Sequence, residues 1–192
     1  MLRISLTGAS GLVGSRIIEL LQNDFIFLPI SQEQMDITDK NKVTEIINSL
    51  DFDIFLHLAA YTNVDSAETN KELAYKINVE GTKNIFEAVQ NKNKKFIYIS
   101  TGFVFDGVNP PYNENSFPNP QSVYAKTKFQ GEKIIKKKAK TQNPFICPVI
   151  DLMKESGYGD AYIKDSLRVL MAKERIEWNT SARKKPLIKF IK

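Results

Sequence analysis

A chain of 192 residues with 42% hydrophobic and 26% charged residues has the composition of a soluble globular protein, with room for one domain and part of a second. These values exclude a fibrous or intrinsically disordered protein, and no stretch approaches the roughly 18 uninterrupted apolar residues of a transmembrane helix. The formal charge of +5 is concentrated at residues 133–140 and 183–192. Apolar Ile134 and Ile135 interrupt the first run, which favours a solvated helix face. We therefore expect neither a nucleic acid nor a membrane as a partner.

Short β-rich runs alternate with longer amphipathic patterns along the first 150 residues. The expected strands are residues 2–6, 25–30, 54–58, 95–100 and 145–150, and the expected helices are residues 12–23, 41–50, 67–90 and 122–140. Strands that alternate with helices pair in parallel and are covered on both faces. The sequence therefore predicts an α/β fold of the Rossmann type, a doubly wound parallel sheet with helices on both faces. Beyond residue 150 the patterns weaken, although residues 160–172 have apolar side chains at helical spacing.

A glycine-rich turn, Thr7-Gly8-Ala9-Ser10-Gly11-Leu12-Val13-Gly14, follows the first expected strand and opens the first expected helix. Glycines allow a sharp turn and a close approach of backbone N–H groups to a pyrophosphate, and the helix N-terminus adds partial positive charge. Three glycines alone are a weak signal, but their place between a strand and a helix predicts a dinucleotide site. The expected contacts are Gly8, Ser10, Gly11, Leu12, Val13 and Gly14.

The end of the second expected strand bears on the choice between NAD and NADP, because an acidic residue there would select NAD. The sequence Ser31-Gln32-Glu33 has no clear acid in the expected place, and Arg16 could favour a 2′-phosphate or simply face solvent. Both cofactors stay open on these residues. Asp36-Ile37 is placed to contact the adenine, and Ala59-Ala60-Tyr61 offers small residues where the cofactor could pass.

A Tyr-x-x-x-Lys pair lies on the helix expected over residues 122–140, where a spacing of four puts Tyr124 and Lys128 side by side. A phenol with a pKa near about 10 exchanges protons poorly at neutral pH, so a neighbouring ammonium group that favours the phenolate is useful. Thr101 follows the fourth expected strand. We expect Tyr124 to donate a proton to a ketone oxygen that receives hydride at its carbon from a nicotinamide. Thr101 would hydrogen-bond that oxygen, and Lys128 would tune Tyr124 and hold the nicotinamide ribose.

Three further residues have less specific interpretations. His57 is the only histidine and lies inside an expected strand, which favours packing against a helix over catalysis. Asn78 is unusual inside a helix, and could kink it and anchor a water near Lys128, or cap it locally. The single Cys147 cannot form an intrachain disulfide, in agreement with a reducing compartment. No spacing of Cys, His and carboxylates indicates a metal site.

Several segments occur in the order typical of one family. They are TGASGLVG (7–14), DIT (36–38), HLAAYTNVDSAE (57–68), INVEGT (77–82), YISTGFVFDG (98–107), PPYNE (110–114) and VYAKTKFQGEK (123–133). With them the chain resembles the extended short-chain dehydrogenase/reductases, and among these it is most similar to the dTDP-4-dehydrorhamnose reductases. The resemblance implies that Thr101, Tyr124 and Lys128 are catalytic. The implied cofactor contacts are Gly11, Leu12, Val13, Asp36, Ile37, Ala59, Ala60, Tyr61 and Ile99, and Asn78, Tyr124 and Lys128 complete the expected cofactor site.

By that resemblance, the chain would be a reductase of a 4-keto-6-deoxy nucleotide sugar that uses reduced NADP or NAD. Residues 1–150 would form the dinucleotide-binding domain, and residues 151–192 a small, partial substrate lobe. We expect a cytoplasmic protein, and the resemblance allows a homodimer. The alternatives are a non-catalytic dinucleotide-binding regulatory subunit and a sugar-nucleotide epimerase.

The chain departs from the family pattern at three places. Gly102-Phe103 stand where the family commonly has an aspartate followed by a tyrosine. Cys147-Pro148 stand where an arginine followed by threonine or proline is common. The family's substrate lobe also continues well beyond the position of Lys192. These departures lead us to expect an intact cofactor site beside a less complete sugar site.

Overall fold

The structure is a computed structural model that describes residues 1–110, 112, 116–138 and 145–147. The helix expected over residues 160–172 and the substrate lobe expected over residues 151–192 lie outside these described residues. The description that follows therefore concerns the expected dinucleotide-binding domain.

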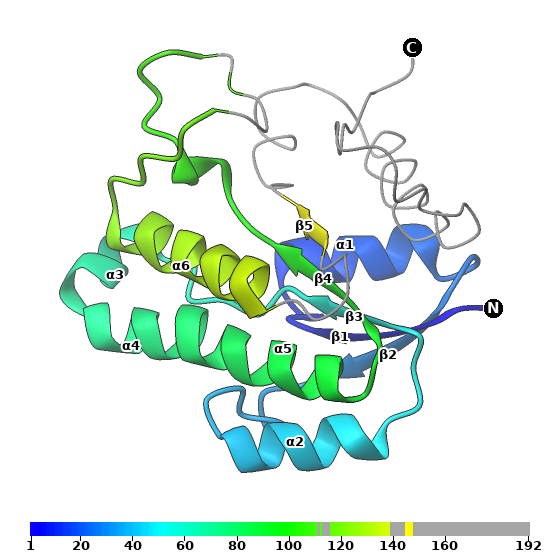
Figure 1. Cartoon of the computed structure of the whole chain (residues 1–192). Helices are drawn as coiled ribbons and strands as arrows, with labels where there is room; N and C mark the ends of the chain where they lie inside the picture. The colour runs from blue at the N-terminus through cyan, green and yellow to red at the C-terminus, as the bar shows by residue number, and fades with distance from the viewer. Residues whose placement is uncertain (111, 113–115, 139–144, 148–192) are drawn as a thin grey trace.

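The elements follow one another as alternating strands and helices (Figure 1). The strands are β1 (Arg3–Thr7), β2 (Ile26–Ile30), β3 (Ile54–His57), β4 (Lys95–Ile99) and β5 (Phe145–Cys147). The α-helices are α1 (Leu12–Leu21), α2 (Lys40–Ser49), α3 (Val64–Thr69), α4 (Lys71–Tyr75), α5 (Thr82–Asn91) and α6 (Val123–Lys138). A π-helical turn, η1 (Lys76–Gly81), joins α4 to α5, and a 3-10 turn, η2 (Gly102–Val104), follows β4.

The strands form one parallel sheet in the order β2-β1-β3-β4-β5. The chain leaves β1 toward one edge to make β2 and then crosses back over β1 to make β3, so the direction of winding reverses between β1 and β3. Thr7 of β1 pairs with Ile30 of β2 and with His57 of β3. The carboxyl ends of these strands therefore meet at one edge of the sheet, the edge at which open α/β sheets bind their ligands.

Helices cover both faces of this sheet (Figure 1). On one face, Ile17 and Leu21 of α1 pack against Leu6 of β1 and the side chains beside it. On the other face, α2, α5 and α6 cover a core that includes Phe55 and Phe96. Alternate residues of β3 and β4 enter opposite cores because successive strand side chains point to opposite faces. The prediction of a doubly wound parallel sheet with helices on both faces is confirmed.

The single helix expected over residues 67–90 is instead three helices and a π-helical turn. The Asn63 side chain accepts a hydrogen bond from the Ser66 backbone N–H and starts α3 three residues earlier than expected. The Asn70 amide donates to the Ser66 carbonyl and Thr69 hydroxyl, and helical geometry breaks at this residue. Asparagine side chains compete with the helical backbone for hydrogen bonds, which accounts for both boundaries. Elsewhere the described ends of strands and helices agree with expectation within two residues.

Candidate active site

The glycine turn packs directly on the end of β3. Gly8 has a φ of +72°, and a Cβ added to it would lie 2.7 Å from the Ala59 backbone nitrogen. The Gly11 N–H donates to the Gly8 carbonyl at 3.1 Å and closes the turn. Gly14 admits no Cβ either, since one would lie 2.2 Å from the Gly8 carbonyl oxygen. These contacts bring the start of α1 against the point at which the winding of the sheet reverses.

No capping side chain bonds the first backbone N–H groups of α1. The N-cap residue is Gly11, which has no side chain to accept from them. Ser10 and Leu12 beside it are exposed. Unsatisfied N–H groups and the positive end of the helix dipole together form an anion site. The expected phosphate contacts from Gly8 to Gly14 thus come together in one turn that fits a diphosphate.

The expected adenine contacts lie beyond the end of β2. The exposed Asp36 carboxylate accepts a hydrogen bond from the Thr38 N–H at 2.8 Å, which holds its pKa below the ordinary range. Ile37 is buried against η1, where a Cβ on Gly81 would lie 2.7 Å from the Ile37 side chain. Its carbonyl accepts from the Asn84 amide at 3.1 Å. Asp36 and Ile37 therefore belong to a loop that hydrogen bonds hold at Thr38 and Asn84.

Ser31 and Arg16, which bear on the choice between NAD and NADP, are each bonded to a residue three positions further along the chain. The Ser31 N–H donates to the Gln34 side-chain oxygen at 2.8 Å, and the Gln34 N–H donates back to the Ser31 hydroxyl at 3.3 Å. Arg16 pairs with Glu19 on the same helix at 2.5 Å. Residues 31–34 thus form a closed turn with polar groups at the end of β2.

The end of β3 is tied to α6 through Asn78. The side-chain oxygen of Asn78 accepts from the Tyr61 N–H at 2.7 Å, and its amide donates to the Tyr61 carbonyl at 3.1 Å and to the Thr127 hydroxyl at 3.0 Å. Asn78 is buried inside η1. Asn78 therefore lies in a π-helical, irregular part of the helix, and its side chain bonds residues outside that helix instead of capping it locally. Its partners come from the loop after β3 and from α6, which local sequence does not reveal.

The predicted catalytic residues lie just after β4 and on the buried face of α6. Tyr124 and Lys128 are 4% and 3% exposed on that face, and Thr101, two residues beyond the end of β4, is fully buried. The Lys128 amine donates to the Ile99 carbonyl at 2.6 Å and lies 4.1 Å from the centre of the Tyr98 ring. The Phe103 ring meets the Tyr124 ring edge to face with centroids 6.5 Å apart. Residues separated by more than twenty positions in sequence thus form one cluster.

Burial lowers the pKa of Lys128 to about 7, and the negative charge of Glu132 opposes this shift. Glu132 is buried one helical turn beyond Lys128 and accepts a hydrogen bond from the Ser100 hydroxyl. Lys136 pairs with its other oxygen at 3.3 Å. Sequence reasoning missed Glu132, although its spacing of four from Lys128 was a readable signal for a helical partner.

His57 is fully buried and bonded at both ring nitrogens. Its Nδ1 lies 2.8 Å from the Thr7 hydroxyl, and its Nε2 lies 3.1 Å from the Thr82 hydroxyl at the start of α5. The imidazole also stacks on the Tyr98 ring. The expected packing of His57 against a helix is confirmed.

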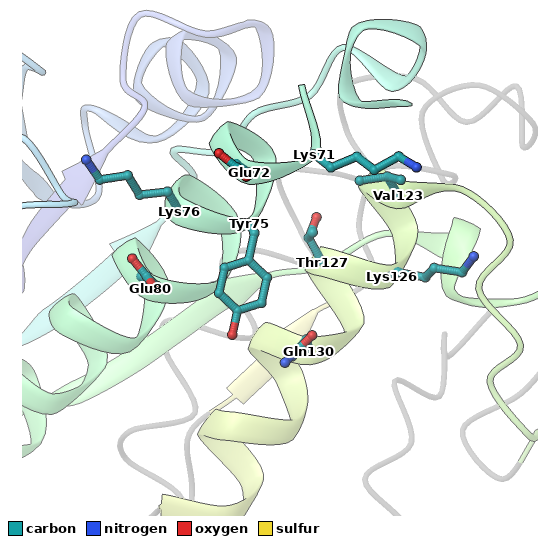
Figure 2. A pocket seen from close by; sticks show the side chains of 9 residues that line it. All are labelled: Lys71, Glu72, Tyr75, Lys76, Glu80, Val123, Lys126, Thr127 and Gln130. Atoms are coloured by element: carbon teal, nitrogen blue, oxygen red, sulfur yellow. The ribbon is translucent and has the colours of Figure 1, made fainter. Parts of the chain in front are cut away.

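A groove of about 600 Å³ runs between α4 with η1 and α6 (Figure 2). Its lining is Lys71, Glu72, Tyr75, Lys76, Glu80, Val123, Lys126, Thr127 and Gln130. None of these is a predicted site residue, although Thr127 of the lining bonds the Tyr124 carbonyl and the Asn78 amide. Within the part of the chain that the structure describes, no three His, Cys, Asp or Glu side chains come together as a metal site. Every helix of that part is too short or too polar to span a membrane.

A glycine turn at the reversal point of a parallel sheet, with a buried Tyr-x-x-x-Lys pair on the helix before β5, defines the class of extended short-chain dehydrogenase/reductases. The family model described as the RmlD substrate binding domain matches residues 2–174. This match covers most of the chain, and the chain belongs to that family.

Relatives and solved structures agree with this membership. The chain is 33% identical to a dTDP-4-dehydrorhamnose reductase from Aggregatibacter actinomycetemcomitans over 178 residues, which are 91% of this chain and 58% of that protein. It is 35% identical to methionine adenosyltransferase 2 subunit beta from Bos taurus over 141 residues, 69% of this chain and 42% of that one. A crystal structure of dTDP-4-dehydrorhamnose reductase from Bacillus anthracis in complex with NADP superposes with a TM-score of 0.69 at 35% identity, over 76% of this chain and 52% of that one. The chain thus spans about half the length of the relatives it matches.

Proposed function

We propose that the chain is an NADP- or NAD-dependent reductase that converts the ketone of a 4-keto-6-deoxy nucleotide sugar into an alcohol. The observation that carries the proposal is the buried Tyr124 and Lys128 pair on α6, whose side chains contact the Phe103 ring and the Ile99 carbonyl, each two residues from Thr101. A tyrosine with a neighbouring lysine is a proton donor of adjustable acidity. Similarity to dTDP-4-dehydrorhamnose reductases supports the choice of substrate class.

The residues would divide the reaction among them as follows. A reduced dinucleotide bound at the glycine turn would supply the hydride that the carbonyl carbon receives. Tyr124 donates its proton to the carbonyl oxygen, and the Thr101 hydroxyl holds that oxygen by a hydrogen bond. The Lys128 ammonium favours the phenolate that Tyr124 becomes, because a positive charge stabilises the anion in a buried site. The alcohol and the oxidised dinucleotide are the products.

The proposed cofactor contacts follow the local geometry. Gly8 to Gly14 would hold the diphosphate through backbone N–H groups, and Asp36 with Ile37 would face the adenine. Ala59, Ala60 and Tyr61 would line the path between the two, and Ile99 and Lys128 would meet the nicotinamide end. Asn78 would act through Tyr61 and Thr127, to which its amide is bonded. We favour NADP, because Ser31 stands where a carboxylate would repel a 2′-phosphate, and the Bacillus anthracis relative holds NADP.

The test is turnover of a dTDP-4-keto-6-deoxy sugar by the purified chain with NADPH. The rate is measured as the loss of NADPH absorbance. We expect Tyr124→Phe to lower kcat by about 10²-fold or more, the usual contribution of a positioned proton donor, with NADPH affinity retained. Tyr75→Phe, which changes an exposed tyrosine of α4, is the matched control and should leave turnover unchanged. Full turnover by Tyr124→Phe would contradict the assignment.

A second candidate is a dinucleotide-binding regulatory subunit without turnover. Two observations favour it: the 35% identity to a protein named as the beta subunit of methionine adenosyltransferase 2, and Gly102-Phe103 in place of the acid and phenol common in reductases. NADPH binding by the wild-type chain without reduction of any keto-sugar nucleotide would decide for this candidate. No feature of the described residues favours the epimerase alternative over these two.

We also propose a cytoplasmic homodimer. Nicotinamide dinucleotides and nucleotide sugars are metabolites of the cytoplasm, which supports that compartment.

The surface of α4 supports the homodimer. Leu73 and Tyr75 of α4 are 46% and 41% exposed, and Tyr75 faces the groove beside α6 (Figure 2). Tyr75 and Val123 supply the apolar part of the groove's lining, and an apolar surface rimmed by polar residues is typical of a protein contact.

A further inference from the structure

A chain of buried contacts runs beneath the candidate site, and His57 stands at its centre. The Thr7 hydroxyl lies 2.8 Å from His57 Nδ1, and His57 Nε2 lies 3.1 Å from the Thr82 hydroxyl. The His57 ring stacks on the Tyr98 ring with centroids 5.9 Å apart, and the Thr82 hydroxyl, as a hydrogen-bond donor, acts to lower the pKa of Tyr98. The Tyr98 O–H donates to the Lys128 carbonyl at 3.3 Å. Its four side chains come from β1, β3, α5 and β4, and all are buried.

One arrangement of protons uses every donor of this chain. The Thr7 oxygen accepts from the Ala59 N–H at 3.3 Å and its O–H donates to His57 Nδ1, whereas a proton on Nδ1 would leave the Thr7 O–H with no acceptor among the described hydrogen bonds. A neutral imidazole with an acceptor at Nδ1 has its proton at Nε2, so Nε2 donates to Thr82. Thr82 then donates to Tyr98, because the Tyr98 proton is used on the Lys128 carbonyl.

The imidazole is neutral throughout the physiological range. Burial, together with the positive charge of Lys128, lowers the pKa of His57 to about 3. The ionisable groups that the structure places around the chain are Lys128, Tyr124 and Glu132 of α6 and Tyr98 of β4. Burial also raises the pKa of Tyr98 well above its ordinary value, so that phenol keeps its proton.

The two ends of the chain reach the two halves of the candidate site. At one end, Thr7 precedes Gly8 directly and is bonded to Ala59, whose backbone nitrogen would lie 2.7 Å from a Cβ on Gly8. At the other end, Tyr98 holds the Lys128 backbone through its O–H and the Lys128 ammonium over its ring. A dinucleotide at the glycine turn would thus contact backbone that is bonded to Thr7. At the other end, Tyr98 fixes the position of Lys128, one helical turn from Tyr124.

We propose that His57 is a positioning residue, which couples the dinucleotide turn to the Tyr124 and Lys128 pair through this directed chain of hydrogen bonds and ring contacts. The inference rests on the proposed function, because it assumes that a dinucleotide binds at the turn. His57 itself touches neither substrate nor cofactor in this role. Directed hydrogen-bond chains in a low-dielectric interior polarise one another, so a change at one end is felt at the other.

The first test uses the fact that the sequence has one histidine. Nuclear magnetic resonance of the full chain labelled with ¹⁵N-histidine reports the tautomer of His57 with no ambiguity of assignment. We expect a neutral ring with its proton on Nε2 from pH 5 to pH 9, and a change in the Nδ1 resonance when NADP⁺ is added. The Nδ1–H tautomer, or a ring that becomes protonated near pH 6, would overturn the proposed direction of the chain.

The second test breaks the chain at Thr82. Thr82→Val keeps the shape of the side chain and removes its hydroxyl, whereas Thr82→Ser keeps the hydroxyl, and Thr44→Val removes an exposed hydroxyl of α2 as a control. The ionisation of Tyr124 is measured with NADP⁺ bound, as phenolate absorbance of each protein minus that of the same protein with Tyr124→Phe. We expect its midpoint to move to higher pH in Thr82→Val and to stay at the wild-type value in the other two.

The outcomes separate the two proposals. If NADP⁺ binds but neither the His57 resonances nor the Tyr124 midpoint in Thr82→Val change, this inference fails and the proposed function stands. An equal shift in Thr82→Val and Thr82→Ser also overturns it, because the hydroxyl would then have no part. If NADP⁺ does not bind, the proposed function fails and this inference fails with it.

Discussion

Gly8 is held by two separate constraints, its positive φ and the nearness of the β3 backbone. Gly107, in the loop after η2, has a similar φ of +80°, but a Cβ there would meet nothing within 4 Å. The pair therefore separates the cost of a left-handed backbone from the cost of a lost close approach. Of the two, only Gly8 lies where a diphosphate is proposed to bind.

We expect Gly107→Ala to lower the free energy of unfolding by about 1–2 kcal/mol, the cost of a left-handed conformation for alanine. Gly8→Ala should lower it by roughly a further 1–3 kcal/mol, because its methyl group overlaps Ala59 and Leu58. Gly8→Ala should also weaken NADPH binding, measured by fluorescence titration, whereas Gly107→Ala should not. Equal NADPH affinity in the two variants would argue against a diphosphate at this turn.

Lys128 makes the stability of the chain depend on pH. Its pKa is about 7 in the folded chain against an ordinary 10.5. Between these pH values the unfolded chain binds more protons than the folded one, so the free energy of unfolding rises with pH across this window. At and below pH 7 the buried ammonium costs on the order of 4 kcal/mol, and above pH 10.5 this cost is gone.

Lys128→Met removes that dependence. In guanidinium unfolding, we expect the variant to be more stable than wild type near pH 6, and this advantage to shrink steadily as the pH rises from 7 to 10.5. Lys126→Met, on the exposed face of the same helix, is the control and should track wild type at every pH. A constant difference between Lys128→Met and wild type would show that Lys128 does not lose its proton in this range.

At the scale of elements, the crossing of α6 over η1 sets the depth of the candidate site. Gly131 faces this crossing, where a Cβ would lie 2.7 Å from the Tyr98 phenol oxygen and 3.2 Å from the Asn78 carbonyl. The π-helical turn places Asn78 where it reaches both the loop after β3 and α6. Such turns are frequent at functional sites because they re-aim a side chain at small cost to the helix.

Gly131→Ala tests this close crossing, because the sign of its effect on the free energy of unfolding depends on whether the added methyl group overlaps its neighbours. Helix propensity alone would make the change stabilising by about 1 kcal/mol, whereas overlap with Tyr98 and Asn78 should destabilise the fold by roughly 1–3 kcal/mol. We expect the net change in chemical unfolding to be destabilising. It should be smaller when Tyr98→Phe is already present, because the nearest atom is then absent. A stabilised Gly131→Ala variant would contradict the crossing as described.

At the scale of the whole molecule, the groove beside Tyr75 bears on assembly (Figure 2). Its lining carries Lys71, Lys76 and Lys126 together with Glu72 and Glu80, so two copies could pair opposite charges across a symmetric contact. We expect sedimentation equilibrium to give about twice the 21.9 kDa mass of one chain. Tyr75→Asp should yield monomer, while Phe117→Asp, which changes an exposed residue outside the groove, should not. A monomeric wild-type chain would reject the homodimer.

The sequence by itself determined the parallel α/β fold, the glycine turn and the pairing of Tyr124 with Lys128. Each of these depends on spacing within one stretch of chain: alternation within a strand, a period of 3.6 in a helix, and glycines between the two. The helix boundaries at Asn63 and Asn70 are also set by local sequence and were predictable from it, because asparagine is a common helix cap.

Only the tertiary structure decided the partners of His57, Asn78 and Glu132. His57 bonds Thr7 fifty residues earlier and Thr82 twenty-five residues later, and Asn78 joins Tyr61 to Thr127. Which of these side chains meet depends on strand order and on where helices cross, and neither is encoded in the spacing of residues along the chain. A buried polar group must find whichever partner the packing brings near, because burial without one costs about 1–3 kcal/mol.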